Sequence, residues 1–364
     1  MEEAVIGESR QAPGGGRMSV GQIEHELGKL RTNDDGSLAL RSSVLNLIVV
    51  TDEESAEEIT TSVSGLAGRY PARAVVLVAD PDEGEPNVDV GLSAFCHARS
   101  GGGAQVCAEQ ITIHAEGPPA EHLESLAGPL LVPDLPVFLW YPGAFSPRSP
   151  EFTAMAQLAD RVILDSAGGP LEDHEACLRQ ISTLLEDPAT PAIGDLQWVG
   201  LSPWRSLLAD TFGAPERAGE LEKIERVEVL YAPGGANRAL LLVGWLASTL
   251  GWTPESTTRS DGGQTVEFSG PSGGITVELS PDSPDARLRR VRLYSEEYSF
   301  QVSRHRAVSD VRTTVMRGED LLAERTVHIG SFDLGVLVGE EMGYRGHDEA
   351  YGAALRAAVE VLDK

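Results

Sequence analysis

Four short apolar runs, separated by stretches with helical periodicity, constrain the fold of this chain more than any other feature. The runs cover residues 44–50, 72–80, 135–141 and 161–167. Runs of this length that are rich in Val, Ile and Leu are typical of strands buried on both faces of a sheet. Because helical stretches alternate with them, we expect a mainly parallel sheet with helices on both faces.

Additional elements are predicted around this pattern. Residues 91–98 and 104–117 flank a glycine-rich turn and predict a hairpin that is added to the sheet. Ser19 and Gln22 form a capping-box pattern, which predicts that the first helix begins at this point. Residues 1–17 are polar, with Gly and Pro near their end, and we expect a flexible tail there.

The second half of the chain shows a different pattern, which predicts a second domain. A strand over 226–232 and an apolar helix over 236–250 precede segments that alternate with a period of two, namely TVEFSG, GITVELS, RRVRLYS, YSFQVSR and AERTVHI. Such alternation predicts an antiparallel sheet with one covered face. A final helix carries Leu355, Val359 and Leu362 on one stripe.

The predicted fold class is therefore α/β, with a Rossmann-like N-terminal sheet and a C-terminal α+β domain. Prolines punctuate the segment between the two patterns, and we place the boundary there. The expected organisation is a flexible tail over 1–17, an α/β domain over 18–190, a connecting segment over 191–220 and an α+β domain over 221–364.

Composition limits the kinds of partner. The chain holds 56 Asp and Glu against 29 Lys and Arg, a formal net charge of -27, which disfavours nucleic acid as a partner. This acidity indicates either general solubility or an acidic docking face.

No apolar run approaches the roughly 20 residues that cross a bilayer, and the N-terminus lacks the apolar region of a signal peptide. Three cysteines do not form a secreted disulfide framework. We expect a cytoplasmic protein that does not contact membranes.

Motifs for catalysis are weak. Residues 270–274 fit G-x-S-x-G, but they lie between two predicted strands, where a hairpin turn is the simpler interpretation. Residues 227–245 combine a strand, a glycine pair and a helix without a nucleotide-binding pattern, and the eight His residues lack metal-ligand spacing. An enzyme would need polar groups at the carboxyl edge of the sheet, where we expect Glu109, Asp134 and Asp165.

We therefore predict no catalytic, cofactor-binding or metal-binding residues. A small-molecule enzyme or a nucleotide-binding sensor on the Rossmann-like sheet is the alternative, and a general scaffold with another client is a third possibility.

Cys96 and Cys107 are placed symmetrically about the glycine-rich turn of the predicted hairpin. A symmetric register puts them directly opposite each other, close enough for a cross-strand disulfide and a redox role. The alternative is that they are two small buried hydrophobic residues.

Two further features are candidates for contact with a partner. Between Arg287 and Arg317 the chain has eight Arg and three acidic residues, and Arg290 and Arg292 share one face of a predicted strand. This face is either a solvated outer surface or a docking surface for an acidic partner. Trp140 and Tyr141 lie at the exit of a predicted parallel strand, where they are either partner contacts or core aromatics.

Several blocks of the sequence together resemble the family of glucose-6-phosphate dehydrogenase assembly proteins, OpcA. The blocks are RSSVLNLIVV (41–50), RYPARAVVL (69–77), QVCAEQITI (105–113), LVPDLPVFLWYPG (131–143), ADRVILDSA (159–167), LSPWRSLLADTF (201–212) and GWLASTLGW (244–252). The resemblance implies a non-catalytic partner of glucose-6-phosphate dehydrogenase that promotes its oligomerisation and activity, under redox control in photosynthetic bacteria.

Overall fold

The computed structural model describes residues 8–11, 16–32, 39–41, 43–82, 84–97, 106–260, 262–282, 288–304, 310–330 and 333–364. The chain divides into two compact units. Unit 1 comprises Met1–Asp165, Pro188–Gly194 and Asp333–Gly346, and unit 2 comprises Ser166–Asp187, Asp195–Phe332 and His347–Lys364. Along the described part of the chain, no helix is both long and apolar enough to span a bilayer.

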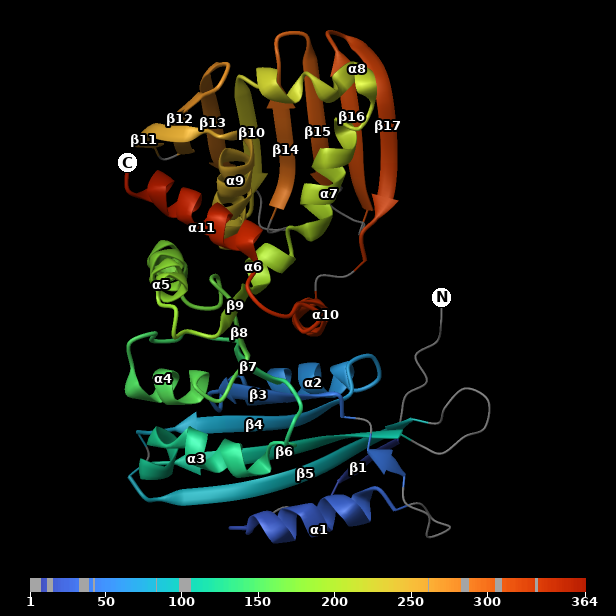
Figure 1. The fold of residues 1–364 in the computed structure, drawn as a ribbon, viewed down its shortest axis with the longest axis vertical. Coiled ribbons are helices and arrows are strands. Elements are labelled where there is room, and N and C mark those ends of the chain that lie inside the picture. Colours follow the sequence, from blue (N-terminus) through green and yellow to red (C-terminus); the bar gives the residue numbers. More distant parts are fainter. Residues whose placement is uncertain are drawn as a thin grey trace. The chain divides into compact units, whose positions relative to one another are not determined.

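Unit 1 is built on a nine-stranded sheet in the order β1-β5-β6-β4-β3-β7-β8-β9, with β2 paired to β6 outside this path (Figure 1). Strand β5 pairs antiparallel with β1 and with β6, whereas the pairs β2/β6, β4/β6, β3/β4, β3/β7 and β7/β8 are parallel. The prediction of a mainly parallel sheet with an added hairpin is confirmed. The strands are β1 (Glu8–Gln11), β2 (Leu40–Arg41), β3 (Leu45–Thr51), β4 (Ala72–Asp80), β5 (Asn87–His97), β6 (Val106–Glu116), β7 (Val137–Tyr141), β8 (Arg161–Leu164) and β9 (Ala192–Asp195).

Helices cover both faces of this sheet. The helical elements of unit 1 are α1 (Val20–Leu30), α2 (Ala56–Leu66), η1 (Pro118–Glu121), α3 (Leu123–Ala127), η2 (Gly128–Leu130), α4 (Pro150–Ala156) and α10 (Leu334–Glu341). On β6, Glu109 faces α1, while its neighbour Gln110 accepts a hydrogen bond from Ser64 of α2, so α1 and α2 lie on opposite faces. Ser19 and Gln22 form the predicted capping box at the start of α1.

Unit 2 is built on an eight-stranded sheet in the order β11-β12-β13-β10-β14-β15-β16-β17. All neighbouring strands pair antiparallel except β10 and β13, which are parallel. The predicted antiparallel character is therefore confirmed, with this one exception. The strands are β10 (Arg226–Tyr231), β11 (Thr253–Ser260), β12 (Gly263–Gly270), β13 (Gly273–Pro281), β14 (Leu288–Tyr294), β15 (Tyr298–Arg304), β16 (Asp310–Arg317) and β17 (Asp320–His328).

The helices of unit 2 pack against one face of its sheet: α7 packs against β15 and β16, and α9 packs against β10 and β13 (Figure 1). Helix α11 packs in turn on α9 and on β11. The helical elements are η3 (Leu171–Asp173), α5 (His174–Glu186), α6 (Leu196–Val199), α7 (Ser202–Thr211), α8 (Pro215–Ala218), η4 (Leu221–Lys223), η5 (Pro233–Gly235), α9 (Ala236–Leu250) and α11 (Glu349–Leu362).

The division into units differs from the expected domain limits, since Ser166–Asp187 belongs to unit 2 and Asp333–Gly346 belongs to unit 1. Residues 8–11, expected within a flexible tail, form β1 and pair with β5. The expected connecting segment over 191–220 instead contains β9, which belongs to the first sheet, and α7, which packs on the second. Prolines in this segment therefore mark helix starts rather than a linker, since Pro203 and Pro215 both occupy the first turn of a helix.

Candidate functional site

The candidate redox pair lies where β5 and β6 face each other. Cys96 is directly opposite Cys107, and the two are joined in a disulfide with a Cα–Cα distance of 4.0 Å. Both side chains are buried, with 2% and 0% exposure, in a cluster with Ala39 and Ala94 against which Leu30 packs. The structure therefore contains a cross-strand disulfide at the predicted register, whereas the intervening glycine-rich residues 98–105 lie outside the described part.

A buried cluster of charged side chains lies beside this disulfide. Glu109, two residues after Cys107 and on the same face of β6, accepts hydrogen bonds from Arg73 of β4 at 2.9 Å to Nε and 2.6 Å to a terminal nitrogen. Its other oxygen is 3.0 Å from Nε of Arg31, and Arg73 also pairs with Glu24 of α1. Arg73 and Glu109 are each 1% exposed. Two carboxylates and two guanidinium groups thus neutralise one another between α1 and the sheet.

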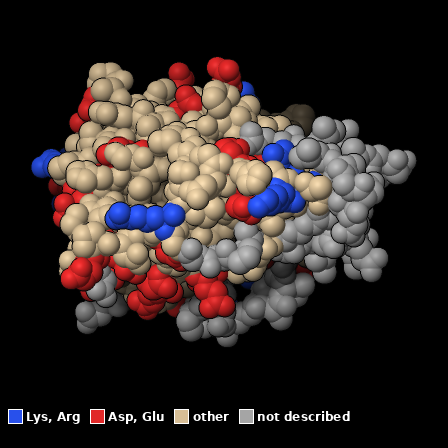
Figure 2. Space-filling view, turned by 90° about the horizontal axis from the view of Figure 1, so that it is seen from below, with Lys and Arg blue, Asp and Glu red and all other residues tan. Residues whose placement is uncertain are grey.

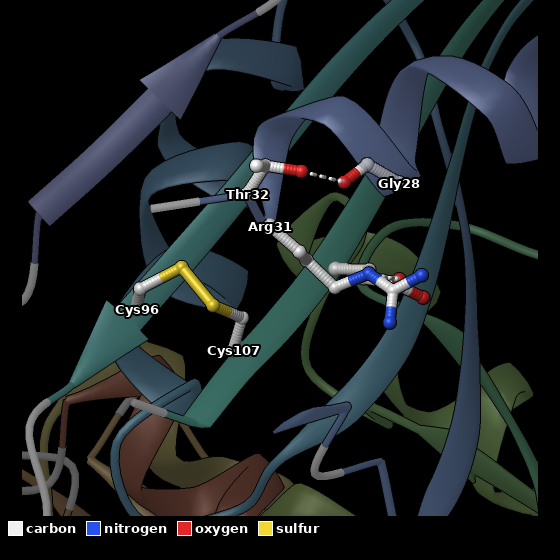
Figure 3. Close-up of a disulfide and its surroundings, with 6 residues drawn as sticks. Gly28, Arg31, Thr32, Cys96 and Cys107 are labelled. Atoms are coloured by element: carbon white, nitrogen blue, oxygen red, sulfur yellow. Dashed lines mark hydrogen bonds and ion pairs between the residues drawn. A yellow bond between two sulfur atoms is a disulfide. The ribbon is translucent and has the colours of Figure 1, made fainter. Parts of the chain in front are cut away.

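The charged cluster and the disulfide together anchor α1. Glu24 and Arg31 lie on this helix, and its buried Ile23 and Leu27 supply the apolar contact. Figure 3 shows Gly28, Arg31 and Thr32 at the C-terminal end of α1 beside the disulfide, with the Thr32 hydroxyl donating to the Gly28 carbonyl at 3.0 Å. The last residue of α1, Leu30, packs against the cluster that holds the disulfide.

This cluster was not predicted from the sequence. Glu109 was expected at the carboxyl edge of the parallel strands, but it is level with Arg73, the second residue of β4, at the amino end of that strand. Asp134 precedes β7 and is also at an amino end, whereas Asp165 follows β8 as expected. The sequence did contain a signal for this cluster. Arg73 and Glu109 each lie within a predicted strand of the sheet, and a charge that is buried there requires a partner of opposite charge.

A count of thiols tests the disulfide. In the oxidised protein under denaturing conditions, we expect one reactive thiol per chain, that of Cys177, and three after reduction. Closing a loop between residues 11 apart in sequence contributes about 3 kcal/mol, so the reductant should lower the free energy of unfolding by about that amount. Three reactive thiols before any reduction would contradict the pairing, and a Cys177→Ser chain, with none before reduction and two after, serves as the control.

Trp140 and Tyr141 are not surface groups. Trp140 is 0% exposed in β7, whose neighbours are β3 and β8, and every residue of β7 is buried. Tyr141 is 9% exposed, its ring lies 5.3 Å from that of Phe152, and burial raises its pKa. Of the two alternatives for Trp140 and Tyr141, the structure supports core aromatics, because both rings pack in the core of unit 1.

The loop that leads into β7 is held by one side chain from β3 and one from the residue that precedes β8. Asn46 of β3 is fully buried; its Oδ1 accepts from the backbone of Val132 at 2.8 Å and its Nδ2 donates to the carbonyl of the same residue at 3.0 Å. Asp160, before β8, accepts from the backbone of Val137 at 2.8 Å. Between these points Asp134 adopts a φ of 63°, a left-handed conformation that Asp tolerates better than most residues. The Pro-Asp-Leu-Pro segment is thus a structural loop.

Arg290 and Arg292 lie on the face of the second sheet that points away from α7 and α9. In β14 they alternate with Val291 and Leu293, which are fully buried, whereas both arginines are partly exposed. Arg292 donates to Ser299 at 3.2 Å and lies 4.8 Å from the ring centre of Tyr294. Burial, followed by the hydrogen bond to Glu228, raises the pKa of Tyr294.

The weak catalytic motifs adopt structural roles. Residues 270–274 connect β12 to β13 with Gly270 paired to Gly273, which has a φ of 144°, so Ser272 belongs to a hairpin turn. At the start of α2, where a parallel sheet of this kind can bind a phosphate, Asp52 already accepts from the backbone of Ser55, and Glu57 and Glu58 occupy the first turn. These carboxylates would repel an anion. Among the described residues no group of three His, Cys, Asp or Glu could hold a metal ion.

Fold and sites together define a two-unit α/β protein whose distinctive buried polar groups hold strands, loops and helices in place. Comparison with known families refines this class. Residues 63–183 match the family described as glucose-6-phosphate dehydrogenase subunit N-terminal domain, and residues 191–355 match the corresponding C-terminal domain. The chain therefore belongs to the OpcA family.

Individual relatives agree with this assignment. The chain is 32% identical over 200 residues to a protein of Nostoc punctiforme named OxPP cycle protein OpcA, a match that covers 54% of this chain and 42% of the relative. It is 31% identical over 200 residues to the protein of the same name in Synechocystis, with 54% and 41% covered. The chain thus spans less than half the length of the curated relatives it matches.

Among solved structures, the chain is similar to KijD10, a 3-ketoreductase from Actinomadura kijaniata, with a TM-score of 0.49 and 9% identity over 86% of this chain and 95% of that one. So distant a likeness indicates nothing about activity.

Proposed function

We propose that this chain is a non-catalytic assembly protein that binds glucose-6-phosphate dehydrogenase and promotes its oligomerisation and activity in the oxidative pentose phosphate pathway. One observation carries the proposal: both halves of the chain match families described as a subunit of that dehydrogenase. We place the partnership in the cytoplasm, in line with the acidic composition and the odd number of cysteines.

A partner without catalytic groups acts only through differences in binding. It raises the activity of an enzyme if it binds the active or assembled state more tightly than the inactive state. A difference of roughly 1.4 kcal/mol shifts that equilibrium about tenfold, which a modest protein interface supplies. Two findings support this mode over an enzyme on the parallel sheet: carboxylates occupy the start of α2, and the G-x-S-x-G segment is a hairpin turn.

Redox control is part of the same proposal. Disulfides in cytoplasmic proteins are usually transient and redox-sensing. Because the Cys96–Cys107 disulfide packs against the end of α1, its reduction would loosen this helix, and the affinity of the chain for the dehydrogenase would change with the state of the cysteines.

Size-exclusion chromatography with an activity assay on the same fractions tests the proposal. The purified chain should not oxidise glucose 6-phosphate. Mixed with the dehydrogenase of the same organism, it should co-elute in a larger complex and raise the activity of the dilute enzyme by about tenfold. Separate elution at micromolar concentrations, together with an unchanged rate, would show that the partner is wrong.

A further inference from the structure

One face of the sheet in unit 2 is open and carries an array of polar side chains. The strand register aligns two rows across β10, β14, β15, β16 and β17. The first row is Glu228, Arg292, Gln301, Thr314 and Glu324, and the second is Leu230, Arg290, Ser303, Arg312 and Thr326. We call these ten residues the basic face after its three arginines. Beyond them, the first row continues to Glu278 of β13, and Asp310 of β16 lies on the same face.

The two glutamates of the basic face are engaged by arginines other than Arg290 and Arg292. Glu228 lies 3.2 Å from Arg226, and Glu324 lies 3.7 Å from Arg312. Within the described ranges, neither Arg290 nor Arg292 has a carboxylate at ion-pair distance, and the Nε atom of each is buried without a hydrogen-bond partner. Because these Nε atoms are buried, the donors available to the carboxylates of a partner are the terminal nitrogens of the two partly exposed side chains.

Arg292, the second residue of the first row, is held in position within the chain itself. The ring of Tyr294 lies between Arg226 and Arg292, whose guanidinium carbons are 4.0 and 4.8 Å from the ring centre. Arg292 also donates a hydrogen bond to the hydroxyl of Ser299. Arginines that are already ordered lose less side-chain entropy when they bind, and Arg and Tyr are enriched among the residues that dominate binding at protein interfaces.

The surroundings favour a protein over a small anion. The basic face extends over five strands, and over β15, β16 and β17 it holds a hollow of about 380 Å³, whose charged lining residues are Arg304, Asp310, Arg312 and Glu324. By contrast, the surface of the chain in Figure 2, seen from the side of α1, carries more acidic than basic side chains. A broad, nearly flat surface with a hollow complements another protein surface.

We propose that the basic face is the docking surface for the dehydrogenase, and that carboxylates of the dehydrogenase pair with Arg290 and Arg292. The inference rests on the proposed function and adds the surface and the chemistry of the contact. Opposite charges at such a contact speed association and make it sensitive to salt.

The test compares binding of the dehydrogenase to the chain and to an Arg290→Ser/Arg292→Ser double variant by biolayer interferometry at two salt concentrations. We expect the double variant to raise Kd by about tenfold or more at low salt, and to weaken the dependence on salt. Arg290→Lys/Arg292→Lys should recover part of the affinity, because it keeps the charge but loses the paired geometry of the guanidinium group. The matched control is Arg325→Ser/Arg356→Ser, which removes two exposed arginines outside the basic face.

The outcomes separate the two proposals. If the original chain binds the dehydrogenase and the double variant binds equally well at an unchanged thermal midpoint, the basic face is not the docking surface and the proposed function stands. If the control variant weakens binding as much as the double variant, the effect is one of net charge, and the inference is also overturned. If the original chain does not bind at all, both proposals fail. Loss of self-association of the chain alone in the double variant would show that a second copy of this chain, rather than the dehydrogenase, occupies the face.

Discussion

Replacing Glu109 by Gln should lower the free energy of unfolding by about 3 kcal/mol, because it removes one charge from a buried network and leaves the opposite charges in place. Glu109 accepts from two nitrogens of Arg73 and neutralises Arg31, while the remaining carboxylate of the network, Glu24, is 41% exposed. The substitution keeps the size of the side chain, so the expected loss comes from the charge and not from a cavity. Chemical denaturation followed by circular dichroism measures it.

The same variant gives a second readout through the disulfide. Arg31 and Glu24 attach α1 to the sheet beside Cys96 and Cys107, so a loosened helix should let a small reductant reach the sulfur atoms faster. Glu26→Gln is the matched control, since it removes a carboxylate from the same helix whose partner, Lys29, is exposed. If Glu109→Gln unfolds at the same denaturant concentration as Glu26→Gln and is reduced at the same rate, the buried network does not anchor α1.

Two of the sequence blocks that carry the family resemblance meet in the packing of unit 1. The block at residues 69–77 supplies Arg73, and the block at 105–113 supplies Cys107 and Glu109, which meet it across β4 and β6. Apolar periodicity predicted both strands. It could not predict that they are neighbours, because the order of strands in a sheet depends on contacts between segments far apart in the sequence.

The surroundings of Trp140 could not be predicted for the same reason. The pattern predicted a strand over 135–141, and β7 occupies residues 137–141 of this run. An apolar run has the same pattern whether its last residues leave the sheet or lie within it. In the structure β7 lies between β3 and β8, and all of its residues are covered. Asn46 and Asp160 hold the loop before it, so the Pro-Asp-Leu-Pro segment of the family signature positions this strand.

The expected domain limits differ from the structure because a late segment returns to unit 1. Glu341 of α10 accepts from Nε of Arg161 at 2.8 Å, and the two residues are 180 positions apart. Both are buried, and a side chain at Gly194 would overlap with Glu341. No local pattern of charge or apolar residues predicts a pairing over such a distance, whereas the helix pattern itself was visible at α9 and α11.

Replacing Gly244 by Ala should destabilise unit 2 by about 3 kcal/mol, despite the better helix propensity of Ala. Gly244 is in α9, within the block at residues 244–252 that contributes to the family resemblance, and it faces α11. A Cβ atom at this position would overlap with the carbonyl oxygen of Ala354 and lie 2.9 Å from the backbone nitrogen of Ala358. Since these are backbone atoms of a second helix, no rotation of a side chain relieves the overlap, and the two helices must move apart.

Gly65→Ala provides the comparison, because Gly65 lies in α2 with no atom within 4 Å of the position of a Cβ. That substitution should leave stability unchanged or raise it by up to about 1 kcal/mol, in line with helix propensity alone. Thermal unfolding of both variants by calorimetry separates the two effects. An unfolding midpoint of Gly244→Ala at or above that of the original chain would show that α9 and α11 do not approach as closely as the structure indicates. A lower midpoint accompanied by unchanged binding of the dehydrogenase at 20 °C would show that the close packing of these helices stabilises unit 2 without being needed for the docking surface.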